Sequence, residues 1–182
     1  MQSPRRVLWE TGFLVFCLFL GVALPALVRM WTGWETVVLP MQLCVLFCGL
    51  LCGPAYGLSC GALCSVFSNI IFGTPSLSAL PVSLCLCALY GFLAGLLVCL
   101  LRSGWGWINV YAALIGAILL GRGIEGILNA FLFRPEAYSW WIWAQESFVI
   151  PLPGLIIQLA VLPVAVLALW KLHPVLGPYG EY

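Results

Sequence analysis

Long apolar segments separated by short breaks dominate the pattern of hydrophobic and polar positions along this chain. Apolar residues occupy every helical face within these segments, so helix breakers and charges mark the segment ends better than periodicity does. The clearest breaks are Gly53-Pro54, the turn-rich stretch 72–81 and Arg102-Ser103-Gly104. The pattern predicts six helices, at about 7–28, 39–52, 55–71, 82–101, 108–131 and 148–171.

Composition identifies the solvent around these helices. Residues of the apolar types make up 64% of the 182 positions and charged residues only 7%, whereas a soluble domain carries roughly 25% charged residues. Lipid tolerates such a surface, and a helix that spans it needs about 20 apolar residues. We therefore expect an all-α membrane protein, a six-transmembrane-helix bundle that forms a single domain over residues 1–182. The segment 7–28 is interpreted as a retained first helix, because no signal-peptide cleavage site follows it.

The few basic residues near helix ends predict the orientation. With six helices and the N-terminus inside, four basic residues fall on the cytoplasmic side and two on the outer side, which favours N-in and C-in. The cytoplasmic residues are Arg5, Arg6, Arg102 and Lys171, and the outer ones are Arg29 and Arg134. No basic stripe suited to nucleic acid is present in the sequence.

Polar side chains inside the predicted spans are the candidates for function. Arg122, Glu125 and Asn129 have i, i+3, i+7 spacing on the fifth helix and so share one face. By helical rise, Arg122 and Gln158 both lie about 15 Å from the outer surface. An ionisable residue in a span is costly unless it is paired or solvated. Arg122 and Glu125 therefore form either a structural pair that locks helices together or one wall of a ligand site.

Two further amides extend this group toward the outer surface. Gln42 begins the second helix and Asn69 ends the third, both within about two turns of that surface. Polar groups thus gather in the outer half, while the inner half has almost none, which predicts a cavity open to the outside. Trp34 and other loop tryptophans would stack on a ligand at its mouth or form an ordinary aromatic belt. The predicted substrate-binding residues are Arg122, Glu125, Asn129, Gln158, Gln42, Asn69 and Trp34.

Glycine and cysteine patterns each leave two interpretations. Gly57 and Gly61 belong to a run of glycines at four-residue spacing, which lets helix backbones approach closely. They either pack helices inside the bundle or form a face that docks a partner membrane protein. The nine cysteines all lie in apolar stretches, where we favour small packing residues over a soft-metal site. We expect no metal and no cofactor.

The order of several short motifs resembles the substrate-binding S components of energy-coupling factor (ECF) vitamin transporters. The motifs are Leu39-Pro40-Met41, Gly49 through Gly57, Gly73–Pro75, Ala88–Gly91, Leu120-Gly121-Arg122 and Leu152–Gln158. The similarity covers about residues 20–171. Members of the family often have His where Gln42 stands and Met-Pro-Pro where Thr74-Pro75-Ser76 stands. Both positions face the pocket that the resemblance implies, which leaves the substrate open.

This resemblance implies a protein of the bacterial cell membrane that captures a vitamin or precursor from outside. It implies partners: a membrane coupling protein and two ATPase subunits, which fits the lack of a phosphate-binding Gly-x-x-x-x-Gly-Lys-Ser/Thr loop. The chain itself is not expected to be an enzyme, since hydrolysis usually needs histidine, paired carboxylates or a metal cluster, and the chain has one histidine in its tail and one intramembrane glutamate. A stand-alone transporter or channel is the alternative. The polar set suits riboflavin-, pantothenate- and cobalamin-related ligands equally.

Overall fold

The computed structural model describes residues 4–31, 39–77, 79–101, 106–133 and 139–172. All regular structure in these ranges is helical. The elements are α1 (Pro4–Trp31), α3 (Pro40–Cys52), α4 (Pro54–Phe72), α5 (Leu80–Leu100), α6 (Gly106–Leu128), η1 (Asn129–Phe133), α7 (Trp140–Ala144), η2 (Gln145–Val149) and α8 (Leu152–Leu172). Each of the six predicted helices is present with its ends shifted by a few residues.

Five helices in the described ranges are long and apolar enough to cross a membrane. They occupy Val7–Trp31, Pro54–Phe72, Leu80–Leu100, Gly106–Phe131 and Leu152–Lys171. Large apolar side chains also cover the outer surface of these helices; Phe19, Ile70 and Val164, for example, are each about two-thirds exposed or more. An apolar exterior of this kind is compatible with lipid as the surrounding solvent, and supports a multi-pass membrane protein.

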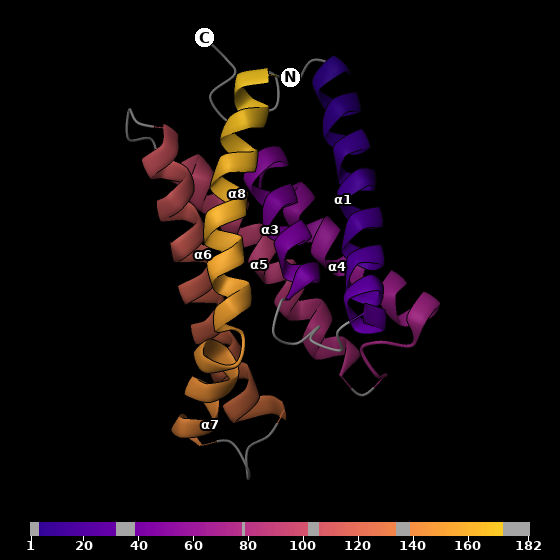
Figure 1. The fold of residues 1–182 in the computed structure, drawn as a ribbon, viewed down its shortest axis with the longest axis vertical. Helices are drawn as coiled ribbons and strands as arrows, with labels where there is room; N and C mark the ends of the chain where they lie inside the picture. The colour runs from indigo at the N-terminus through magenta and orange to yellow at the C-terminus, as the bar shows by residue number, and fades with distance from the viewer. Residues whose placement is uncertain (1–3, 32–38, 78, 102–105, 134–138, 173–182) are drawn as a thin grey trace.

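Helix α3 is the exception, because its 13 residues rise only about 20 Å. It ends at Gly53, whose φ of 90° lies in a region that residues with a side chain rarely adopt. The ring of Pro54 then prevents the α3 helix from continuing and starts α4 in its first turn. The chain reverses here, as Figure 1 shows for the neighbouring α3 and α4.

Glycines bring α4 and α5 into close contact. A Cβ on Gly57 would clash with the carbonyl oxygen of Gly91, and a Cβ on Gly61 would clash with that of Cys87. Gly57 and Gly61 are buried in this interface. The four-residue glycine spacing therefore serves packing inside the bundle, and the interpretation of Gly57 and Gly61 as an exposed partner-docking face is corrected: neither residue offers a surface to another chain.

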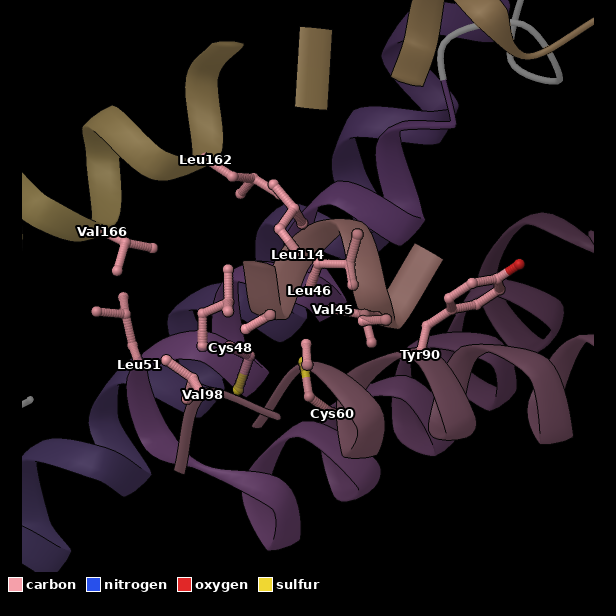
Figure 2. Close-up of a cluster of buried hydrophobic side chains, with 14 of the residues drawn as sticks. Val45, Leu46, Cys48, Leu51, Cys60, Tyr90, Val98, Leu114, Leu162 and Val166 are labelled. Atoms are coloured by element: carbon pink, nitrogen blue, oxygen red, sulfur yellow. The ribbon is translucent and has the colours of Figure 1, made fainter. Parts of the chain in front are cut away.

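The core lies between α3 and the helices around it, and cysteines contribute much of it. Leu46, Leu50 and Leu114 are fully buried, and Leu162 and Val166 of α8 close the cluster. Figure 2 shows Leu46 of α3, Val98 of α5, Leu114 of α6 and Leu162 of α8 converging on this cluster. The buried cysteines are Cys17, Cys44, Cys48, Cys52, Cys60 and Cys64, all with free thiols. Their positions are those of small apolar packing residues.

The two ends of the bundle differ. The start of α1 and the end of α8 lie at the same end, whereas the turn between α4 and α5 and the short helix α7 lie at the opposite end (Figure 1). We call the latter the loop end. Residues 132–147 were expected to form a loop, but α7 and the π-helical segment η2 occupy 140–149. The stacking of Trp140 on Trp143, 4.8 Å between ring centroids, accompanies this helical turn.

Candidate functional site

A cavity of about 290 Å³ opens at the loop end of the bundle. Five helices and the α4–α5 turn contribute to its walls, and most of the lining is apolar. The lining residues are Pro25, Leu39, Pro40, Met41, Gln42, Ser68, Thr74, Pro75, Ser83, Leu86, Cys87, Tyr90, Arg122 and Glu125. A mostly apolar, concave site with a few convergent polar groups is the usual form of a small-molecule site.

An ion pair forms the charged wall of this cavity. Nη1 of Arg122 lies 3.2 Å from Oε2 of Glu125, and the hydroxyl of Tyr90 donates a 3.1 Å hydrogen bond to the same oxygen. The guanidinium carbon of Arg122 is also 5.9 Å from the centre of the Tyr90 ring, within range of a cation–π contact. The three side chains thus form one unit, in which the charge of Arg122 is compensated by both the carboxylate and the ring.

Two residues of α6 position this unit. Gly121 lies directly against the Tyr90 ring, which a Cβ at that position would displace. The indole nitrogen of Trp143 donates a 3.0 Å hydrogen bond to the backbone carbonyl of Arg122. Gly126 in turn leaves room for the Trp143 ring. The Gly121-Arg122 pair therefore has a physical explanation: Gly121 leaves room for the Tyr90 ring, and the side chain of Arg122 reaches the cavity.

Hydrogen-bond donors are in excess at this wall. Arg122 is only 4% exposed, and its Nε and Nη2 have no hydrogen-bond partner among the described residues. Gln42, 6% exposed, likewise has an Nε2 without an acceptor in that part of the chain. A buried donor left unsatisfied costs about 1–3 kcal/mol, and more when it is charged. Both side chains line the cavity, so a ligand that supplies acceptors would relieve this cost.

The backbone around the cavity is also constrained. Leu39, which lines it, has left-handed torsions of φ 49° and ψ 51° immediately before Pro40. Such torsions are uncommon for a residue with a branched side chain and often occur at ligand sites. At the α4–α5 turn, the amide of Asn69 donates to the carbonyl oxygen of Pro75, and Arg29 donates to the Thr74 hydroxyl at 3.4 Å. These contacts hold the α4–α5 turn, which supplies Thr74 and Pro75 to the cavity.

The structure brings together three of the seven residues that the sequence nominated: Arg122, Glu125 and Gln42. Asn69 supports the rim without lining the cavity. Asn129 begins η1, one turn beyond Glu125, and is absent from the lining. Gln158 is fully buried on α8, a helix that contributes no residue to this cavity. Trp34 lies outside the described residues.

The distribution of polar groups needs one correction. The half of the bundle near the start of α1 was expected to hold almost none, yet Glu10 and Asn109 are each only 2% exposed there. Both lie close to the predicted starts of their helices, at about 7 and 108, and the predicted set of polar groups inside the spans contains neither. Helices α3 and α4 meet in this half, and Cys52 at the end of α3 contacts the backbone of Glu10.

Tyr90 is the functional residue that sequence reasoning missed. It belongs both to the apolar core and to the cavity wall, and Figure 2 shows its hydroxyl directed away from the core cluster. A tyrosine within an apolar span needs a hydrogen-bond partner for its hydroxyl. The presence of Glu125, an acceptor inside a neighbouring span, was the sequence signal that could have identified Tyr90.

A second, mostly apolar cavity of about 450 Å³ lies next to Trp140 and Trp143 on α7. It is lined from α6 and η1 by residues including Gly126 and Phe131.

Comparison of the chain with known protein families, with curated proteins and with solved structures identified no significant match.

Proposed function

We propose that this chain is the substrate-specific S component of an ECF-type importer. In this role it captures a vitamin-like small molecule from outside the cell and delivers it through a membrane coupling protein powered by two ATPase subunits. The observation that carries the proposal is the cavity at the loop end, because it places a buried arginine with two unsatisfied nitrogens in an apolar pocket between membrane-spanning helices. An intramembrane charge in such a position is a functional-site hypothesis by default.

The position of the cavity supports a capture role. Its lining comes from the end of α1, the start of α3, the end of α4, the start of α5 and the end of α6, which all lie at the loop end. The apolar cluster of Leu46, Leu50 and Leu114 occupies the bundle centre. A pocket that opens at one end and is backed by a packed core suits binding followed by a movement of the whole protein. The ECF-like order of motifs agrees with a chain that binds the ligand and leaves ATP hydrolysis to its partners.

The orientation of the bundle is part of the proposal. The start of α1 and the end of α8 lie at the same end of the bundle. Arg5 and Arg6 belong to the start of α1, and Lys171 belongs to the end of α8. By the positive-inside rule, we propose that both termini lie in the cytoplasm and that the cavity opens toward the outside. Reporter fusions at the two termini test this directly, since a reporter active only outside at either end would contradict it.

A stand-alone secondary transporter or channel is the competing function. A channel needs a polar path across the membrane, and the cluster at the bundle centre is apolar. A secondary transporter commonly shows inverted repeats with helices broken at midplane. The Gly53 break between α3 and α4 is a chain reversal, with no counterpart of the same kind in the described parts of α5, α6 and α8.

Vesicle uptake separates the two functions. The full chain is purified in mild detergent, and the small molecule that accompanies it is identified by mass spectrometry. The same molecule is then offered to vesicles that contain the chain alone, and to vesicles that also contain an ECF coupling protein with its ATPases and ATP. The proposal predicts binding by the chain alone and accumulation only in the complete system. Concentrative uptake by the chain alone would establish the competing function instead.

A further inference from the structure

We infer that the ligand of the loop-end cavity is a small monocarboxylate whose carboxylate is bound by the Nε–Nη2 edge of Arg122. This inference rests on the proposed function only in that the cavity binds a small molecule. It goes further by assigning the charge and the chemical class of that molecule.

The first step is the geometry of Arg122. Its Nη1 is directed to Glu125, which leaves Nε and Nη2 as the two nitrogens without a described partner. These two nitrogens carry parallel N–H groups on one edge of the planar guanidinium. That edge matches the two oxygens of a carboxylate in a bidentate pair. The ion pair with Glu125 thus orients Arg122 and leaves its bidentate edge available for a ligand.

The second step is the balance of donors and acceptors. Gln42 adds a third buried nitrogen without an acceptor among the described residues, and it lines the same cavity. A ligand that displaces water from the cavity must supply acceptor oxygens to these three nitrogens, because a buried donor without a partner is costly. Glu125 supplies an acceptor to the cavity, because the hydrogen bonds that it accepts from Tyr90 and Arg122 both end on Oε2. Its Oε1 can therefore accept one hydroxyl or amide N–H of the ligand.

The third step is the charge of the site. Arg122 and Glu125 together are neutral, so a bound monocarboxylate leaves one net negative charge beside the guanidinium. A phosphate monoester carries about −1.5 to −2 at neutral pH and would leave about one and a half to two times that negative charge next to the Glu125 carboxylate. Since an uncompensated charge in a low-dielectric interior is costly, the site favours the carboxylate over the phosphate.

The fourth step is the shape of the remaining ligand. The cavity of about 290 Å³ is at the small end of the roughly 300–1,000 Å³ found for small-molecule sites, so the part of the ligand inside it is small. Pro25, Pro40, Met41 and Leu86 supply apolar walls away from the charge pair. A short aliphatic or aromatic body attached to one carboxylate satisfies both requirements.

Competitive retention of matched probes tests the inference. The full chain in lipid nanodiscs is dialysed against an equimolar mixture of phenylpropanoate, phenylpropanamide and phenylpropyl phosphate, together with hexanoate, hexanamide and hexyl phosphate. Retained compounds are quantified by mass spectrometry, and empty nanodiscs measure partition into lipid. Within at least one set we expect the acid to be retained at least about tenfold more than its amide and its phosphate.

Variants then assign the preference to Arg122. Arg122→Lys keeps the positive charge but lacks the planar fork, and Arg122→Gln with Glu125→Gln removes both charges together. Both should abolish the preference for the acid, whereas Gln158→Leu, which alters a buried amide outside the cavity, should retain it. If the double variant does not fold, Arg122→Lys decides alone.

Each other outcome overturns the inference in a distinguishable way. Preferential retention of an amide or a phosphate refutes the carboxylate but leaves ligand capture, and so the proposed function, intact. An acid preference that survives in Arg122→Lys and in the double variant places acid binding elsewhere. No retention of any probe by the folded chain refutes the monocarboxylate class, and the vesicle experiment then decides the proposed function independently.

Discussion

The hydroxyl of Tyr90 on α5 lies 3.1 Å from Oε2 of Glu125 on α6 and donates a hydrogen bond to it. The ring of the same tyrosine is part of the apolar core. Tyr90 therefore connects the packed centre of the bundle to the ion pair of the cavity. A change in the core at this position is expected to reach Glu125 and Arg122, and a change in the ion pair is expected to affect core packing.

Tyr90→Phe tests this connection. The substitution keeps the ring and its contact with Arg122 but removes the hydrogen bond to Glu125. We expect the thermal stability of the purified chain to fall by an amount equivalent to about 1 kcal/mol. Tyr111→Phe on the exposed surface of α6 is the matched control, and it should change little. Equal melting temperatures for the two variants would show that the Tyr90–Glu125 bond contributes nothing to stability.

The glycines between α4 and α5 give a second prediction. Gly57→Ala and Gly61→Ala place a methyl group against the backbone carbonyls of Gly91 and Cys87, and backbone cannot move aside as a flexible side chain does. We expect each to destabilise the chain by about 1–3 kcal/mol. Gly12→Ala, with open space around its new methyl group, should be neutral or slightly stabilising. Thermal unfolding of all three in one detergent makes the comparison.

The opposite result would be informative in a specific way. If Gly57→Ala and Gly61→Ala were as stable as Gly12→Ala but failed to associate with a coupling protein, the two glycines would face a partner. The packing of α4 on α5 described above would then be incorrect.

Much of the helical framework could be predicted from the sequence, because length and composition of apolar segments depend on local chemistry. Gly53-Pro54 illustrates this, since glycine followed directly by proline favours a helix end, whereas the single prolines Pro25 and Pro163 lie inside α1 and α8. Residues 140–149 show the limit: their tryptophans and polar residues resemble an interfacial loop, and only the packing of Trp143 against Gly126 and the Arg122 carbonyl explains the helical turn found there.

The site was predictable in part for a similar reason. The spacing of Arg122 and Glu125 lies within one helix and follows from helical geometry. Gln158 shows what residue spacing cannot predict. Helical rise gives its depth in the membrane, but the direction of its side chain around α8 depends on how α8 packs against α3 and α6. That packing turns Gln158 into the bundle interior away from the cavity. Tyr90 joins the site only through the contact between α5 and α6.

Gly121 provides a prediction about binding that depends on shape and not on charge. Gly121→Ala should push the Tyr90 ring out of its place beside α6 and disturb the orientation of Glu125 and Arg122. We expect affinity for the co-purifying ligand to fall at least about tenfold, or about 1.4 kcal/mol. Gly123→Ala lies two residues along the same helix with open space around its methyl group. Isothermal titration should give it the affinity of the unmodified chain, and equal losses in both variants would refute the role of Gly121.

Native mass spectrometry of the chain with and without its charge pair tests the central claim most directly. The unmodified protein and the Arg122→Gln, Glu125→Gln double variant are purified in parallel, and the fraction of each that carries a bound small molecule is measured. Removing both charges together avoids leaving one buried charge without its partner, which alone would be strongly destabilising. The account predicts a bound small molecule on the unmodified chain and its loss from a folded double variant. Equal occupancy by the same molecule in both would contradict it, and would make Arg122 and Glu125 a structural pair.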